Sequence, residues 1–337
     1  FTKGPVEEPQ LIENEEDLLQ TFGQPYSVDN HYEYWMVASS YLAYGGTMQV
    51  IRANDSGLKN ATEDGAPELL IKSDTHYNQL GYDDNTITGT VIAAKTPGSY
   101  ANGIRVSIID GKADQILTVS GISTVGMGIT QSVANRVVAG AAGTSLLDGY
   151  LKGIVTGIPE SGKAEVKVLS HVSAAGTVTS VDYQSNGVYC FKASEIITPI
   201  AAGANVGTGS TQVVTTQVDW FEQQEIVLTT KDGNGNPIKL EWDALADAPG
   251  TSSYAQARGG RFDELHVVVI DDKGTITGNA GTILEKHLNL SKATDAEYSV
   301  GSTAYWRKYL ANVSQYIYGG SAPAGITTTG YDNATAT

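Results

Sequence analysis

The chain has 337 residues and a formal net charge of −16, with 37 acidic residues against 21 Lys or Arg. So few basic residues argue against direct binding to nucleic acid, whose affinity comes chiefly from Lys and Arg, and against binding to an anionic membrane surface. Cys190 is the only cysteine, which excludes an intramolecular disulfide framework and a cysteine-based metal cage and makes the reducing cytoplasm the expected compartment.

The first fifty residues are predicted to form two helices and a strand. Asn14 is a good N-cap, and the short helix that follows it ends at Gly23. A second helix is expected from about residue 30 to the glycines at 45 and 46, with an apolar stripe that we predict to be core. That stripe consists of Tyr34, Trp35, Ala38, Tyr41 and Leu42. The run TMQVIRA at 47–53 is expected to be the strand on which this helix packs.

The middle of the chain is predicted to be built from short strands. β-favouring runs occur at 88–93 and 104–109, on either side of the turn TPGSYANG. From residue 111 to about residue 216, Gly, Ala, Ser, Thr and Val predominate, and acidic and basic residues are equal in number. Because this block shows no long helical period, we interpret 111–216 as an inserted, β-rich outer domain, either a barrel or a sandwich.

The last third is predicted to return to mixed α and β structure. Strands are expected at 225–230, 237–242, 263–270, 282–290 and 315–318, with KDGNGN as the hairpin turn between the first two. Because 104–110 and 264–270 are both apolar runs, we predict that they share one sheet. Ser302 is expected to cap a helix whose inward residues are Tyr305, Trp306, Tyr309, Leu310 and Val313.

Two loops are similar to ligand-binding motifs but each has the wrong residue at a required position. GIPESGK at 157–163 has the first seven positions of a phosphate-binding loop, but Ala164 cannot supply the hydroxyl group that ligates magnesium. We interpret the segment as a hairpin turn. Residues 232–236 have the Asp-x-Asn-x-Asn spacing of a calcium loop, but Pro237 stands where a glycine is required. A β-turn is the expected structure there.

No set of residues is predicted to be catalytic or to hold a metal ion or a cofactor. The Asp doublets are interpreted as solvated turns, in which each carboxylate caps local backbone amides; they are Asp83, Asp84, Asp271 and Asp272. The histidines lack metal-ligand spacing; they are His31, His76, His171, His266 and His287. A thiolate pair of Cys190 with His171 is disfavoured because both lie in a period-two β pattern. We therefore predict that the protein is not an enzyme.

Three segments follow one another in a distinctive order. Residues 4–53 run from a GP turn through an acidic helix and TFGQP to an aromatic helix ending in YGG and a VIRA strand. Residues 96–110 read TPGSYANGIRVSIID. Residues 263–296 contain DELHVVVIDDKGTITGNAGTILEKHLNL, and the chain continues through a helix to QYIYGG. In these motifs the chain resembles the contractile tail sheath proteins of T4-like myoviruses and cyanophages.

This resemblance implies a structural protein of the virion, assembled in the host cytoplasm. Sheath subunits stack in six-fold rings around a tail tube, and their contraction drives the tube through the host envelope for genome delivery. The energy is stored in subunit contacts and released by repacking between two arrangements. The implied partners are identical sheath subunits, the tail tube protein, the baseplate and the tail terminator. No direct contact with nucleic acid, no cofactor and no membrane insertion are implied.

The expected fold class is α+β and multi-domain, with a mixed α/β sheath core and the inserted β-rich outer domain. An inner α/β sub-domain is expected at 1–95, a middle α+β domain at 96–110 with 217–320, the outer β domain at 111–216, and a flexible tail or the start of a further part at 321–337. The resemblance also implies linking arms at both ends that this chain lacks. We therefore expect the chain alone to be a monomer or a weak oligomer.

A second function class stays open beside the sheath interpretation. A β-rich surface-adhesion or carbohydrate-binding module is suggested by 18 Tyr, 4 Trp and the Ser- and Thr-rich middle block. Such a module requires exposed aromatic side chains clustered in a groove. The sheath interpretation instead places Trp35 and Trp306 in buried cores, so the exposure of these two side chains separates the two classes.

Overall fold

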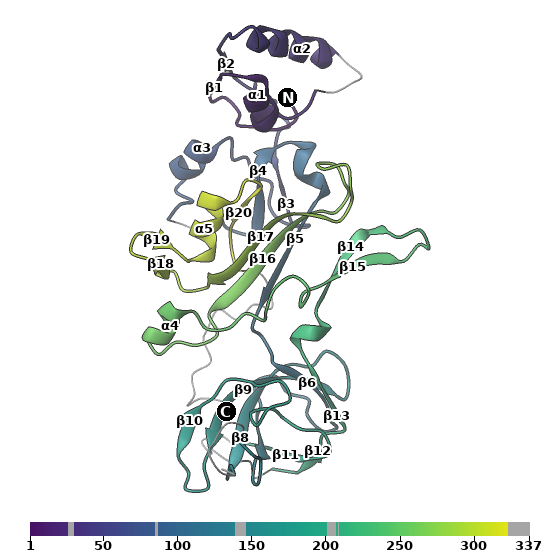
Figure 1. The fold of residues 1–337 in the computed structure, drawn as a ribbon, viewed down its shortest axis with the longest axis vertical. Helices are drawn as coiled ribbons and strands as arrows, with labels where there is room; N and C mark the ends of the chain where they lie inside the picture. Colours follow the sequence, from purple (N-terminus) through teal and green to yellow (C-terminus); the bar gives the residue numbers. More distant parts are fainter. Residues whose placement is uncertain (26–29, 85–86, 139–145, 201–206, 208, 323–337) are drawn as a thin grey trace. The chain divides into compact units, whose positions relative to one another are not determined.

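A computed structural model describes residues 1–25, 30–84, 87–138, 146–200, 207 and 209–322. Helix accounts for 16% and strand for 35% of the structure, so the fold is mixed α and β and largely β-rich. The chain divides into two compact units (Figure 1). The first comprises Phe1–Ile108, Leu228–Ile238 and the described residues from His266 onward, and the second comprises Ile109–Val227 and Lys239–Leu265.

The first unit begins with a small α/β body. Its elements are β1 (Gln10–Ile12), α1 (Glu15–Phe22), α2 (Asn30–Ala43) and β2 (Met48–Val50). The predicted caps of α1 are confirmed, because Asn14 Oδ1 accepts a hydrogen bond from Asp17 N at 2.9 Å and Gly23, with φ of 79°, follows the last helical residue. β1 and β2 pair antiparallel. Both helices pack on this ribbon through a core that includes Leu18, Phe22, Trp35, Leu42 and Val50.

The predicted stripe of α2 is only partly buried. Trp35 and Leu42 are 5% and 4% exposed, as predicted. Tyr34 and Tyr41 are 73% and 52% exposed, so their assignment to the core was wrong. At 3.6 residues per turn, positions 34 and 41 lie about a quarter turn away from positions 35 and 42. The core of this body takes up the row of Trp35 and Leu42 and leaves the neighbouring row of Tyr34 and Tyr41 exposed.

Two three-stranded sheets form the rest of the first unit. The first has the order β20-β4-β3, and its strands are β3 (Asn60–Thr62), β4 (Ile92–Pro97) and β20 (Ile317–Gly319). The second has the order β17-β16-β5, and its strands are β5 (Ile104–Asp110), β16 (Glu264–Asp271) and β17 (Thr282–Ser291). The prediction that 104–110 and 264–270 share a sheet is confirmed. The expected strand at 88–93 begins later, at Ile92.

Short elements complete this unit. They are α3 (Asp74–Gln79), the 3-10 helix η1 (Ser99–Gly103), the hairpin of β14 (Glu225–Lys231) with β15 (Pro237–Glu241), the ribbon of β18 (Glu297–Ser299) with β19 (Ser302–Thr303), and α5 (Trp306–Val313). Tyr305 occupies the N-cap position of α5, and Ser302 lies in β19, so the predicted Ser302 cap was wrong. Trp306 and Leu310 are buried as predicted, whereas Val313 is half exposed.

The second unit is a single curled sheet with its connections. Its elements are β6 (Gln115–Thr118), β7 (Gly128–Ser132), β8 (Tyr150–Gly157), β9 (Lys163–Val172), β10 (Val178–Ser180), β11 (Ile196–Pro199), β12 (Gln212–Val213), β13 (Thr216–Asp219), η2 (Phe221–Gln223) and α4 (Ser253–Ala257). The strand order is β12-β11-β7-β8-β9-β6-β13, with β10 beside β9. This path curls into a half-barrel. The predicted β-rich block is therefore present, as an open sheet whose end strands do not pair within the described residues.

The concave side of the half-barrel holds the core of this unit. Leu117, Ile129, Leu151, Val166 and Phe191 are among its fully buried side chains. β8 and β9 form an antiparallel hairpin, which confirms that GIPESGK closes a turn. None of the helices described in either unit combines the length and apolar character that crossing a bilayer requires.

Candidate functional site

An apolar groove lies between the two sheets of the first unit. It has a volume of about 580 Å³. Ile92 and Ala94 of β4 line one wall together with Ile317 of β20, while Ala93, on the other face of β4, packs in a core with Tyr318. The sheet β20-β4-β3 thus turns one face to a closed core and the other face to the groove, as the alternation of side chains in a strand dictates.

β5 forms the other wall of the groove. Ile104, Val106 and Ile108, which share one face of this strand, line the groove, and residues 104–108 are only half buried. β5 is also the end strand of its sheet, because within the described residues it pairs with β16 alone. One edge of β5 (Figure 1) therefore has no partner strand among the described residues, and the apolar groove lies beside this strand.

This arrangement suits an extended polypeptide better than a small molecule. A segment that paired with the free edge of β5 would make main-chain hydrogen bonds, and its alternate side chains could enter the groove. Glu63 also lines the groove, and its carboxylate oxygens accept hydrogen bonds from Val91 N at 2.5 Å and Ile92 N at 3.1 Å. The alternation of β5 is visible in the sequence, but its lack of a second partner strand is not.

The calcium-like segment 232–236 is the turn of the β14–β15 hairpin, as predicted. Asp232 Oδ1 accepts hydrogen bonds from Asn234 N at 2.8 Å and Asn236 N at 2.9 Å. These backbone hydrogen bonds lower the pKa of Asp232. Its carboxylate oxygen thus caps the turn. Among the described residues, no group of three or more His, Cys, Asp or Glu side chains could hold a metal ion.

Asp271 and Asp272 are not solvated as we expected, although Asp271 caps local backbone amides as predicted. Asp271 is fully buried and Asp272 is 5% exposed. Asp271 closes the loop after β16, because its carboxylate accepts hydrogen bonds from the backbone N–H groups of residues 275–277 at 2.7 to 2.9 Å. Asp272 instead reaches Thr229 of β14 and Arg105 of β5. Asp83 and Asp84 are exposed, as expected.

Because of Asp272, we expect the stability of the first unit to fall as the pH decreases in the acid range. Burial alone would raise the pKa of this carboxyl group, but hydrogen bonds from Thr229 and the charge of Arg105 outweigh it and hold the pKa below its usual value. A lowered folded-state pKa contributes stability that is present above the unfolded-state pKa of about 4 and is lost as the pH falls through the folded-state pKa.

Asp272→Asn should therefore flatten the loss of stability between about pH 4 and pH 2, measured by urea unfolding at each pH. The same substitution at exposed Asp84 is the matched control for losing a carboxylate, and it should cost less stability at neutral pH. An acid profile that Asp272→Asn leaves unchanged would show that this buried carboxylate does not govern the acid response.

Cys190, His171 and His266 each form a hydrogen bond with a different backbone group. Cys190 is buried, its thiol donates to Gly187 O at 3.2 Å, and burial raises its pKa. His171 lies 2.6 Å from Asp148 O through its Nε2 atom. His266 accepts a hydrogen bond from Asn289 N at 3.0 Å. Each of these groups has a structural partner of its own.

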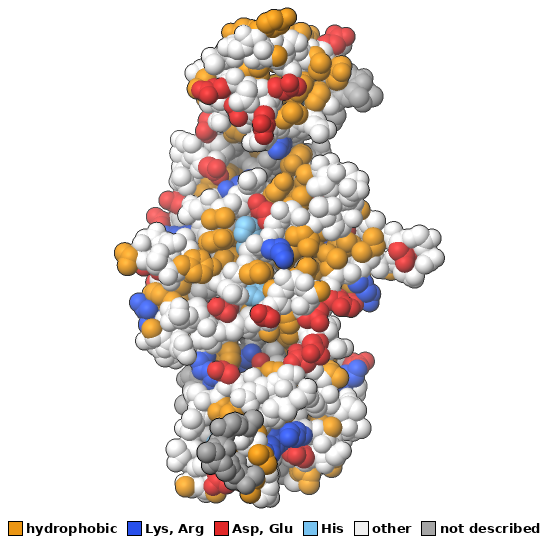
Figure 2. All heavy atoms as spheres, in the orientation of Figure 1, with side chains coloured by type: hydrophobic (Ala, Val, Ile, Leu, Met, Phe, Trp, Pro, Cys, Tyr) orange, Lys and Arg blue, Asp and Glu red, His pale blue; other side chains and the backbone are white. Residues whose placement is uncertain are grey.

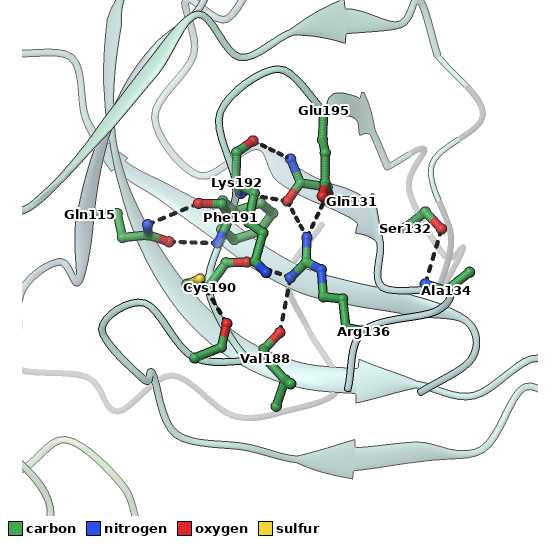
Figure 3. Close-up of polar contacts among 11 residues, drawn as sticks. Gln115, Gln131, Ser132, Ala134, Arg136, Val188, Cys190, Phe191, Lys192 and Glu195 are labelled. Atoms are coloured by element: carbon green, nitrogen blue, oxygen red, sulfur yellow. Dashed lines mark hydrogen bonds and ion pairs between the residues drawn. The ribbon is translucent and has the colours of Figure 1, made fainter. Parts of the chain in front are cut away.

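Two glutamine side chains of the half-barrel hold a loop by imitating strand pairing (Figure 3). Gln115 Oε1 accepts from Phe191 N at 2.7 Å, and its Nε2 donates to Phe191 O at 3.0 Å. Gln131 makes the same pair of hydrogen bonds with Lys192, at 2.7 Å and 3.0 Å. Both glutamines are almost fully buried. They fix the segment that carries Phe191 into the core. No pattern in the sequence marked either glutamine as important.

Arg136 completes this network. Its guanidinium group donates to Val188 O at 2.9 Å and Cys190 O at 2.6 Å, and to Gln131 Oε1 at 2.8 Å and Glu195 Oε2 at 2.6 Å. The side chain of Arg136 is 5% exposed. The network therefore ties the loop to the sheet through both terminal nitrogens of the guanidinium group, while its Nε atom is buried without a hydrogen-bond partner among the described residues.

Comparison of the chain with protein-family models, with curated proteins and with solved structures gave no match.

Proposed function

We propose that this protein is a structural subunit of a contractile phage tail sheath, which polymerises in six-fold rings around the tail tube and contracts to drive it through the host envelope. The observation that carries the proposal is the free edge of β5 beside the apolar groove. A contracting polymer needs links that survive large subunit rotations. A strand added to a neighbour's sheet is such a link, because its backbone hydrogen bonds move with it.

The proposed occupant of the groove is an extended segment of a neighbouring sheath subunit. Support comes from the segments that resemble sheath proteins, because they coincide with compact parts of the fold. Residues 4–53 contain the whole β1-α1-α2-β2 body with its shared core, and 263–296 contain the adjacent strands β16 and β17. In this proposal the half-barrel unit is the variable, outward domain, and the further partners are the tube protein, the baseplate and the tail terminator.

The buried state of the tryptophans favours the sheath over a surface-adhesion or carbohydrate-binding module. All four are at most 5% exposed; they are Trp35, Trp220, Trp242 and Trp306. The exposed aromatic side chains of α2 are tyrosines on the outer side of a helix. Carbohydrate sites are concave and gather their aromatic and polar groups around the ligand. The proposal includes no catalytic step and no cofactor.

The test is electron microscopy of the polypeptide expressed with any residues that its gene encodes on either side of this sequence. Six-fold rings or striated tubes are expected. Hydrogen exchange should then be slower for the β5 amides in tubes than in free subunits, because an added strand satisfies that edge. Absence of rings and tubes under every condition would overturn the sheath proposal. Tubes with unchanged exchange in β5 would overturn the role of the groove.

A charged side chain in the groove should also block assembly. Val106→Asp is expected to raise the protein concentration needed for tube formation at least about tenfold, because the carboxylate would be buried against Ile92 and Ile108 in the occupied groove. Val227→Asp, at a 41% exposed strand position outside the groove, is the matched control and should assemble normally. Circular dichroism melts of both variants establish that they fold. Normal tubes from a folded Val106→Asp protein would contradict the proposed occupancy.

A further inference from the structure

The outer side of α2 carries a row of exposed apolar side chains. The tyrosine row, as we name it, consists of Tyr34, Val37, Tyr41 and Tyr44, which are 73%, 69%, 52% and 94% exposed. Spacings of three and four residues place Tyr34, Val37 and Tyr41 on one side of the helix, and Tyr44 directly follows the last helical residue, Ala43. The adjacent side, about a quarter turn away, packs in the core through Trp35 and Leu42. A helix whose apolar surface extends beyond its core-facing side is ordinarily covered there as well.

Packing within the protein fixes the orientation of the row. Core packing of Trp35 and Leu42 fixes the rotation of α2 about its axis. The ring of Tyr41 lies against Gly46, because a Cβ atom added at Gly46 would be 2.4 Å from Tyr41 Cε1. Any side chain at position 46 would therefore displace the ring. Rigid tyrosines supply contact area at low entropic cost, as at many protein interfaces.

The surroundings of the row are acidic. Residues 1–40 contain eight acidic residues against Lys3, a net charge of −7. Glu33 lies on α2 itself, and α1 begins with Glu15, Glu16 and Asp17. Figure 2 shows acidic side chains among apolar ones over the part of the chain where Figure 1 places α1 and α2. Two copies joined through this face would bring like charges together, which disfavours a symmetric dimer and favours a basic partner.

We propose that the tyrosine row docks an amphipathic helix whose apolar face is flanked by Lys or Arg. From Tyr34 to Tyr41 the row covers seven helical steps, roughly 10 Å, which matches about two turns of a partner helix, and Tyr44 lengthens the row beyond the end of α2. Its 3-4-3 spacing is that of the a and d positions in paired helices. The basic flanks would face the acidic surroundings and raise the rate of association, while burial of the tyrosines would supply most of the affinity. This inference does not depend on the sheath proposal.

The test uses a synthetic helical peptide of about three heptads with Leu at a and d and Lys at e and g, and an isomer with Glu in place of Lys. Binding to the whole chain is measured by fluorescence anisotropy at low and at high salt. The Lys peptide should bind at least about tenfold more tightly than the Glu peptide, and high salt should reduce that difference. Equal binding of the two peptides would overturn the charge argument.

Serine substitutions locate the site. Tyr41→Ser should weaken binding of the Lys peptide about tenfold, the effect of removing a central interface tyrosine, and serine has a helix propensity close to that of tyrosine. Tyr32→Ser, at a 45% exposed position on another side of the same helix, should change binding less than about twofold. Equal effects of the two substitutions would overturn the site. Sedimentation showing a dimer that Tyr41→Ser dissolves would identify a second copy as the occupant instead.

Discussion

Trp306→Ala should lower the free energy of unfolding by about 3 to 5 kcal/mol, the range for truncating a large buried aromatic side chain. Trp306 is 4% exposed at the first position of α5. Its ring lies on the backbone of β20, because a Cβ atom added at Gly319 would be 2.7 Å from Trp306 Cζ3. Truncation would therefore open a cavity between a helix and a strand that have little freedom to close it. Trp35→Ala should cost a similar amount in the core of the α1–α2 body.

Thermal and urea unfolding of Trp306→Ala measure this effect. Val313→Ala is the matched control, because Val313 lies at the other end of α5 and is 50% exposed, so its loss should cost about 0.5 kcal/mol or less. Lys163→Ala should be similarly mild, since its ion pair with Glu160 is on the surface. If the control cost as much as Trp306→Ala, the assignment of α5 to the core would be wrong.

Arg136→Met should destabilise the half-barrel unit by about 3 to 5 kcal/mol, as expected when one partner of a buried, charged network is removed. Methionine replaces the apolar stem of arginine and lacks the guanidinium group. The loss therefore isolates the guanidinium group, whose removal leaves the carbonyl groups of Val188 and Cys190 buried without their donors. Hydrogen exchange should show faster opening of 187–195 than of the β8–β9 hairpin.

Glu195→Gln is the matched control for the charge. The Glu195 side chain is 39% exposed, and its replacement leaves the other three hydrogen bonds of Arg136 in place, so a loss of only about 1 kcal/mol or less is expected. Urea unfolding followed by the fluorescence of the buried Trp220 and Trp242, which belong to the same unit, reports on this region. Equal losses for Arg136→Met and Glu195→Gln would show that the exposed ion pair, and not the buried carbonyl groups, carries the stability.

The two surfaces that we propose as interfaces differ in what they offer a partner. The edge of β5 offers backbone groups beside an apolar groove, so it selects for an extended segment more than for a particular sequence. The tyrosine row offers side chains on a rigid helix in acidic surroundings, so it selects for shape and charge. Assembly tests on β5 and peptide binding to α2 therefore address separate contacts and can fail independently.

Local signals in the sequence were sufficient where neighbouring residues determine the structure. The caps Asn14 and Gly23 bound α1 as predicted, because a cap satisfies backbone groups only a few residues away. KDGNGN and GIPESGK close hairpins for the same reason. The apolar runs at 104–110 and 264–270 share a sheet, since strands of that character must bury their side chains together.

Tertiary structure decided which of several apolar or polar faces would be covered. The sequence of α2 offers apolar residues on adjacent faces, and only the packing of α2 in the shared core determines that Trp35 is buried while Tyr34 is exposed. Asp272 has a turn-like sequence, yet Thr229 of β14, 43 residues away along the chain, donates to its carboxylate. β5 has a free edge because β16 is its only partner among the described strands, and this pairing is set by the tertiary fold. Such outcomes follow from contacts between distant segments, and local periodicity carries no information about them.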